Sequence, residues 1–109
     1  MKNLKTYIHN TILPSYQNAD EGHRQDHIRN VIDRSLRFAS AYNAEHREHL
    51  NLDMVYAIAA FHDIALAEGY DRSVHEIVSG QILAQDPVIQ SLFSVQDIKT
   101  MQQAVEDHR

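Results

Sequence analysis

The segment from Asn51 to Asp63 constrains the fold more than any other part of the sequence. It reads Leu52-Asp53-Met54-Val55-Tyr56-Ala57-Ile58-Ala59-Ala60-Phe61 before the pair His62-Asp63, and it is apolar on nearly every side. Such a helix is stable only when other elements cover it. Asn51 is a suitable N-cap, because its side chain accepts hydrogen bonds from the first free N–H groups. The segment therefore predicts a helix in the centre of a bundle.

The spacing of apolar residues predicts further helices, because only three glycines and two prolines are present to separate short strands. The first predicted helix carries Leu4, Tyr7, Ile8 and Ile12 and is stopped by Pro14, and the second covers about 23–42 with the apolar stripe Ile28, Val31, Ile32, Leu36 and Ala39. After the central helix, another begins with the capping box Ser73/Glu76, buries Val74, Ile77, Val78 and Ile82, and ends at Asp86-Pro87. A short turn with Val88, Ile89 and Leu92 leads to a last helix, which Ser94 and Asp97 cap and which has Ile98, Met101, Val105 and His108 on one face. We expect a single all-α domain of five to six helices over residues 1–109.

Composition excludes several classes of function. The chain has no cysteine, which removes disulfides, thiolate nucleophiles and Cys-ligated metals, so any metal must bind His and carboxylates. The formal net charge of −5 disfavours nonspecific binding of nucleic acid. No glycine-rich phosphate loop is present. The apolar runs are too short for a membrane span and no secretory leader follows Met1, so we expect a cytoplasmic protein.

His62 and Asp63 stand at the end of the predicted central helix, where an imidazole and a carboxylate need partners. An uncompensated buried charge destabilises a fold, and a cation bound by both side chains would compensate them. His62 follows Ile58 by one turn and so faces the core, with Asp63 about 100° round the helix. Another helix must supply more ligands, and His27 is the best candidate. His23, one turn earlier, is a candidate outer ligand or substrate contact.

Two stretches together carry a family resemblance. The run Gly22-His23-Arg24-Gln25-Asp26-His27-Ile28-Arg29-Asn30-Val31, followed by Ala57-Ile58-Ala59-Ala60-Phe61-His62-Asp63-Ile64, resembles the HD-domain superfamily of metal-dependent phosphohydrolases. That family has a His on one helix, a His-Asp doublet at the end of a buried apolar helix, and a later Asp. His27 matches the first His, and His62 with Asp63 match the doublet.

The resemblance extends from about His23 to the end of the chain and implies an HD-like helical bundle. It also implies that His75 and His108 serve as extra metal ligands or phosphate contacts. The chain stops at Arg109 before a match to the later metal-binding Asp, within the periodic pattern of its last helix. We therefore expect the domain to be incomplete at its C-terminus.

The ligand set indicates the chemistry. Imidazole with carboxylate suits Mn, Fe, Co, Ni or Zn better than Ca. An ion with an open position lowers the pKa of bound water from about 15.7 toward roughly 7 and polarises a phosphoryl oxygen. The hypothesis is hydrolysis of a small phosphate ester, a nucleotide or a similar compound. Asp63 would be a ligand and proton acceptor and Glu68 an outer base, while the phosphate would be neutralised by Arg24, Arg72 and Arg109.

Other interpretations fit the same residues. The pair His62-Asp63 is also typical of a hydrogen-bonded pair that ends a core helix. A second function is a non-catalytic HD-type module that binds a metal, a ligand or a partner without turnover. A third is a helical interaction domain, in which the apolar strip Ile98, Met101 and Val105 packs on a second copy to form a homodimer.

Overall fold

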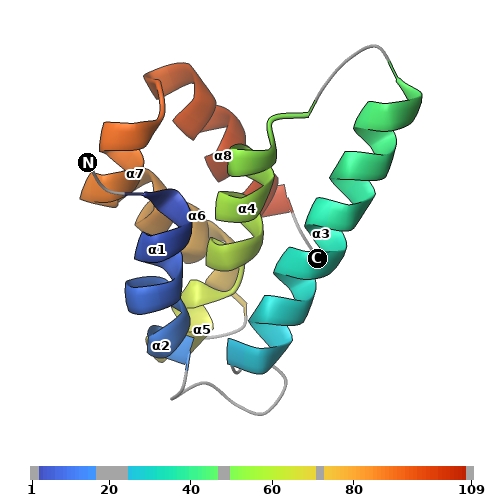
Figure 1. Ribbon diagram of the computed structural model, residues 1–109. Coiled ribbons are helices and arrows are strands. Elements are labelled where there is room, and N and C mark those ends of the chain that lie inside the picture. Colours follow the sequence, from blue (N-terminus) through green and yellow to red (C-terminus); the bar gives the residue numbers. More distant parts are fainter. Residues whose placement is uncertain (1–2, 17–24, 47–49, 71–72, 108–109) are drawn as a thin grey trace.

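The fold is all-α, as the sequence predicts. The computed structural model describes residues 3–16, 25–46, 50–70 and 73–107 (Figure 1), and every regular element within these ranges is a helix. The predicted site residues His23, Arg24, Arg72, His108 and Arg109 lie outside them. Within the same ranges, no helix has the length and apolar character needed to cross a membrane.

The helices form a bundle in which α4 packs against α3 on one side and against α6, α8 and the N-terminal helical segment on the others (Figure 1). The elements are α1 (Leu4–Tyr7), η1 (Ile8–Ile12), α2 (Leu13–Ser15), α3 (Gln25–Glu45), α4 (Leu52–Phe61), α5 (Ile64–Ala67), α6 (His75–Gln85), α7 (Pro87–Leu92) and α8 (Val95–Asp107).

Helix α4 begins as predicted. The Asn51 side-chain oxygen accepts hydrogen bonds from the backbone N–H groups of Asp53 at 3.0 Å and Met54 at 3.2 Å. The second half of α4 is the buried part, and Ala57, Ala60 and Phe61 are fully enclosed. The first turn of α4 is less buried than its apolar sequence predicts: Leu52 is 40% exposed.

The prediction that Pro14 stops the first helix is wrong. The helical segment continues through Pro14 to Ser15, and Tyr16 after it is completely buried. Within η1 the turn is wider than in an α-helix, with the N–H of Leu13 bonded to the carbonyl of Ile8. A proline ring clashes with the carbonyl four residues earlier in a regular α-helix. A wide turn just before Pro14 changes that register, so the segment bends and does not end.

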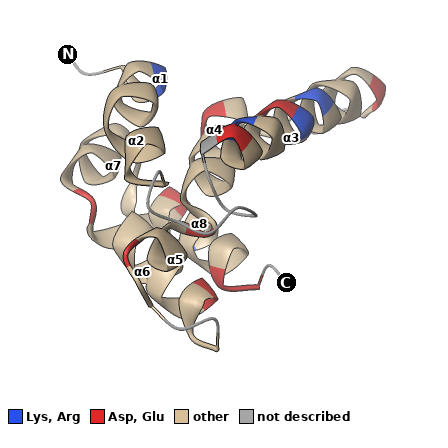
Figure 2. Cartoon of the chain, turned by 90° about the horizontal axis from the view of Figure 1, so that it is seen from below, with Lys and Arg blue, Asp and Glu red and all other residues tan. Residues whose placement is uncertain are grey.

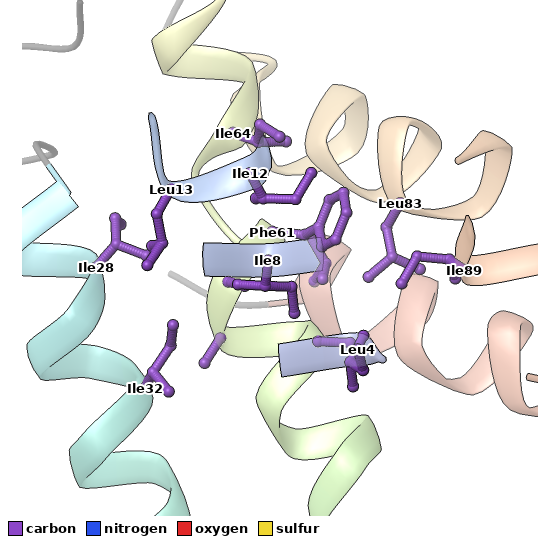
Figure 3. Packing of buried hydrophobic residues seen from close by; sticks show 14 of the residues in the cluster. Leu4, Ile8, Ile12, Leu13, Ile28, Ile32, Phe61, Ile64, Leu83 and Ile89 are labelled. Carbon is purple, nitrogen blue, oxygen red and sulfur yellow. The ribbon is translucent and has the colours of Figure 1, made fainter. Parts of the chain in front are cut away.

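The hydrophobic core joins the N-terminal segment to α4 and α6. Figure 3 shows Phe61 of α4 between Ile8 and Ile12 on one side and Leu83 of α6 on the other. The predicted stripe of α3 is confirmed, since Ile28, Ile32 and Ala39 are buried and Val31 and Leu36 pack against the core. Burial of one such side chain contributes about 1.5–3 kcal/mol, so this shared core holds the end of α4 in place.

The buried face of α6 differs from the prediction. The buried residues are Glu76, Ser79, Gly80 and Leu83, whereas Val74 and Ile77 are 41% and 49% exposed. The helix begins at His75, so its N-cap is Val74 and not Ser73. Small residues explain the rotation: a Cβ at Gly80 would lie 2.8 Å from Cγ of Glu106 and 3.2 Å from the carbonyl oxygen of Gln102. Helix α6 therefore packs against α8 through the face that carries Gly80.

The residues predicted to form a turn after Asp86 form α7. The Asp86 side chain caps this helix, accepting hydrogen bonds from the N–H groups of Val88 at 2.8 Å and Ile89 at 3.1 Å. Its second carboxylate oxygen accepts a hydrogen bond from the hydroxyl of Tyr7, which ties α1 to α7. Burial and this carboxylate both raise the pKa of Tyr7.

The cap predicted at Ser94 is confirmed, because its hydroxyl accepts a hydrogen bond from the N–H of Asp97 at 3.1 Å. Helix α8 packs its predicted face inside the chain. Met101 and Val105 are completely buried, and Ile98 packs against the same core. The chain itself therefore covers Met101 and Val105, which are not available to a second copy, and the homodimer stays a prediction.

The Gly80 contact predicts a specific loss of stability. We expect Gly80→Leu to lower the free energy of unfolding by about 1–3 kcal/mol, because the new side chain overlaps α8. The neighbouring Gln81 is exposed on the same helix. We expect Gln81→Leu to change stability by less than about 0.5 kcal/mol, as for other surface substitutions. Urea unfolding of both variants measures the difference, and equal midpoints would contradict the close α6–α8 packing.

Candidate functional site

The predicted His-Asp pair lies in the turn that follows α4. His62 keeps helical backbone angles, and Asp63 leaves them, with φ −120° and ψ 16°, before α5 begins at Ile64. The carbonyl of Asp63 then accepts a hydrogen bond from the N–H of Leu66 at 3.0 Å. The chain thus turns sharply at Asp63, whose residue exposure is only 6%.

The hydrogen bonds of His62 define what its ring can do. Its Nδ1 lies 2.6 Å from the carbonyl oxygen of Ala59, and a carbonyl only accepts, so Nδ1 carries the proton. Its Nε2 lies 3.1 Å from Oδ2 of Asp63. In a neutral ring with Nδ1 protonated, Nε2 presents a lone pair. Two lone pairs at this distance repel, so the pair needs a proton or a metal ion.

His75, in the first turn of α6, approaches the same carboxylate. Its Nε2 lies 3.3 Å from Oδ1 of Asp63, and its Nδ1 lies 3.0 Å from Oε2 of Glu76. Both nitrogens of one ring therefore face carboxylates. The side chains are mostly enclosed, with exposures of 20% for His75 and 11% for Glu76. A carboxylate on Nδ1 orients a histidine ring and makes its Nε2 a stronger ligand.

Tyr16 and Ser79 hold the turn from two sides. The Tyr16 hydroxyl donates a hydrogen bond to the carbonyl of Ala60 at 2.7 Å and accepts one from the backbone N–H of Asp63. On the other side, the Ser79 hydroxyl of α6 accepts a hydrogen bond from the N–H of Ala65 at 3.0 Å. Both supports are buried, so water does not compete with these bonds.

The structure brings together three of the predicted metal ligands: His62, Asp63 and His75. His27 lies in the first turn of α3 and its side chain is exposed. Glu68, the predicted outer base, is an exposed residue at the end of α5. Within the described part of the chain, no group of three or more His, Asp and Glu side chains is placed to hold a metal ion.

Sequence reasoning missed two residues of this site, Glu76 and Tyr16. The capping-box pattern predicts a cap role for Glu76, but Glu76 lies three, four and seven positions before Ser79, Gly80 and Leu83 and so on the small-residue face of α6. Tyr16 lay beyond the predicted stop at Pro14. Its spacing of four residues after Ile12 continues the buried stripe of the first helix, and this was the available signal.

A scan against models of protein families, a search of curated proteins and a search of solved structures each found no match to this chain. The resemblance to the HD-domain superfamily therefore stays a prediction from the sequence motifs.

The Tyr16 hydroxyl makes the fold sensitive to alkali. Burial raises the pKa of Tyr16 well above its ordinary value of 10.0, and the nearby Asp63 carboxylate raises it further, against the effect of the N–H bond. The folded chain therefore keeps the phenol protonated at a pH where the unfolded chain ionises. Stability from this group is fully present below a pH of about 10 and is lost as the pH rises above it.

We expect the free energy of unfolding to fall with pH above about 10, more steeply in the wild type than in Tyr16→Phe. The difference in slope is up to about 1.4 kcal/mol per pH unit. Urea unfolding at several values between pH 8 and 11 measures it. Tyr70 is half exposed, and Tyr70→Phe serves as the control for removal of a tyrosine hydroxyl outside the core. Parallel curves for the wild type and Tyr16→Phe would overturn this account of Tyr16.

Proposed function

We propose that this chain is a metal-dependent phosphohydrolase of the HD type, with His62, Asp63 and His75 as metal ligands. The observation that supports it is the approach of two imidazole Nε2 atoms to the two oxygens of one buried carboxylate. Each ring has its Nδ1 bonded to another acceptor, the carbonyl of Ala59 or the carboxylate of Glu76. Metal-binding histidines are held in this way.

The separations of the donor atoms also fit metal coordination. Two donor atoms that each lie about 2.1 Å from one ion are roughly 3.0 Å apart across an octahedral edge and roughly 3.4 Å apart across a tetrahedral edge. The two Nε2 atoms lie 3.1 and 3.3 Å from the Asp63 oxygens. Small rotations of the side chains would turn these contacts from hydrogen bonds into edges of a coordination shell. His27 and His108 remain the proposed additional ligands.

The donor set of imidazole and carboxylate suits Mn, Fe, Co, Ni or Zn. When bound, such an ion would lower the pKa of water in its shell and polarise a phosphoryl oxygen. The residues of the chain have separate tasks. Asp63 would accept a proton from the attacking water, and Tyr16 and Ser79 would fix the turn that presents it. Glu68 is the proposed outer base, and Arg24, Arg72 and Arg109 are the proposed phosphate contacts.

A second candidate function is a non-catalytic HD-type module that binds a ligand or a partner. One observation favours it: His62 and His75 pair with Asp63 and Glu76, and among the described residues no group of three is placed to hold an ion. In this interpretation, protonated His62 and His75 neutralise Asp63 and Glu76, and the cluster only supports the fold. Metal content distinguishes the two functions.

The first test of the proposed function concerns metal binding. Protein purified without chelator or affinity-resin metal should contain a transition metal at close to one ion per chain, and His62→Ala should lose it. His46 directly follows α3, where it is exposed and stacked on Tyr42. His46→Ala is therefore the matched control and should keep the metal. Glu76→Gln should weaken metal affinity by about 10- to 100-fold, because it alters the support of a ligand.

Plasma mass spectrometry measures the metal in each variant, and circular dichroism shows that each variant folds. A wild type that stays metal-free after exposure to Mn, Co, Ni and Zn would overturn metal binding. The non-catalytic module would then be the better description.

The second test of the proposed function concerns hydrolysis. With the metal bound, the wild type should release inorganic phosphate from a panel of small phosphate esters. Asp63→Asn should lower the rate by about 10²–10⁴-fold, because it removes both a ligand charge and the proton acceptor. Asp53 is exposed in the first turn of α4, and Asp53→Asn is the control expected to keep activity. Unchanged phosphate release by Asp63→Asn would rule out this role for Asp63.

A further inference from the structure

An apolar groove lies between α3 and α4 and ends at the candidate site. Its volume is about 530 Å³, within the range of small-molecule pockets. Figure 1 shows α3 beside α4 at the outer side of the bundle, and Figure 2 shows its C-terminal part projecting beyond the other helices. The walls include Phe38 and Val55, and Leu50 stands where the chain enters α4. The same His62 whose Nε2 faces Asp63 also lines the groove.

The walls of the groove offer few hydrogen-bond partners. Among the described lining residues, the polar side chains are Arg34, Ser35 and His62. Leu50 presents only its side chain, because its N–H and carbonyl are both bonded to the side chain of Asn43, at 2.7 and 3.0 Å. A sugar or a nucleobase placed here would lose hydrogen bonds to water without replacing them, which is unfavourable. An alkyl or aryl group loses none.

The groove also carries a positive charge beside its apolar walls. Arg34 lines the groove with an exposed guanidinium, and within the described part of the chain it has no ion pair. Figure 2 shows both basic and acidic segments along α3, and Arg34 is the Lys or Arg among the described residues that line the groove. Phe38 is 71% exposed and Leu50 is 40% exposed, so the groove carries apolar surface that the described chain leaves uncovered. An anion with an apolar tail would meet both the cation and the uncovered apolar surface.

We propose that this groove binds the apolar organic group of the substrate, which is then a phosphate monoester of an alkyl or aryl alcohol and not a nucleotide. This inference rests on the proposed function, because it places the phosphate at His62 and Asp63. The ester bond lies where the groove meets the cluster, and the organic group extends along α3 toward Phe38 and Leu50. Arg34 attracts the anion to the groove.

The test compares three esters with the metal-loaded chain: hexyl phosphate, butyl phosphate and the polar glycerol phosphate. Each methylene that enters the groove should raise kcat/KM about fourfold, mainly through KM. Hexyl phosphate should therefore exceed butyl phosphate by about tenfold or more. The double variant Phe38→Ala/Leu50→Ala removes two wall side chains that are 71% and 40% exposed, so its fold should persist. We expect it to reduce the hexyl-to-glycerol ratio of kcat/KM at least about tenfold.

The control is Val95→Ala. Val95 is 72% exposed on α8 and lies outside the groove, so its loss removes a similar exposed apolar side chain and should leave the ratio unchanged. Equal kcat/KM for all three esters in the wild type would overturn the groove assignment while the proposed hydrolysis stands.

Calorimetric titration of hexyl phosphate into the metal-free chain separates the two proposals. If no ester is hydrolysed but hexyl phosphate binds the wild type and not the double variant, the proposed hydrolysis fails and the groove is supported as a site for apolar anions. If hexyl phosphate is neither hydrolysed nor bound, the groove assignment is wrong.

Discussion

The hydrogen bonds of the Tyr16 hydroxyl are the constraint on which the candidate site depends. This one group donates to the carbonyl of Ala60 and accepts from the N–H of Asp63. It therefore satisfies two backbone groups that the end of α4 leaves without helical partners. Because Tyr16 is fully buried, the turn cannot exchange these bonds for water. The direction of the Asp63 carboxylate follows from this turn, and both histidines are oriented toward that carboxylate.

Local patterns in the sequence predict the elements that carry the site but not their rotation. Asn51, the stripe of α3 and the position of His62-Asp63 at the end of α4 follow from capping and periodicity, which act within a few residues. The buried face of α6 depends instead on contact with α8. Apolar residues alone favour the face with Val74 and Ile77, but close approach of two helices favours Ser79 and Gly80. Pairwise packing of this kind is decided between distant segments, so periodicity in one helix does not reveal it.

That rotation of α6 has a direct consequence for the site. With Ser79 and Gly80 facing inward, Glu76 lies on the buried face one turn earlier and His75 lies beside it, within reach of Asp63. A face centred on Val74 and Ile77 would point Glu76 in another direction. The rotation that brings Gly80 against α8 therefore also brings His75 and Glu76 to the cluster. The sequence resemblance identified His75 as a ligand candidate, whereas Glu76 became apparent only from the packing.

The charges of the cluster give a physical reason to look for a cation there. Asp63 and Glu76 are two enclosed carboxylates, and neutral imidazoles add no compensating charge. Buried carboxylates destabilise a fold unless charge and hydrogen bonds offset their loss of water. Two protons on the histidines or one divalent ion would both supply the missing charge. The two sources of charge differ in geometry. A proton joins each ring to its own acceptor, whereas an ion binds both Nε2 atoms and the Asp63 oxygens at one position. Both Nδ1 atoms are turned away from Asp63 and both Nε2 atoms are turned toward it. This orientation suits hydrogen bonds from protonated rings as well as a shared ion, and within the described residues no group of three is placed to hold an ion as it stands.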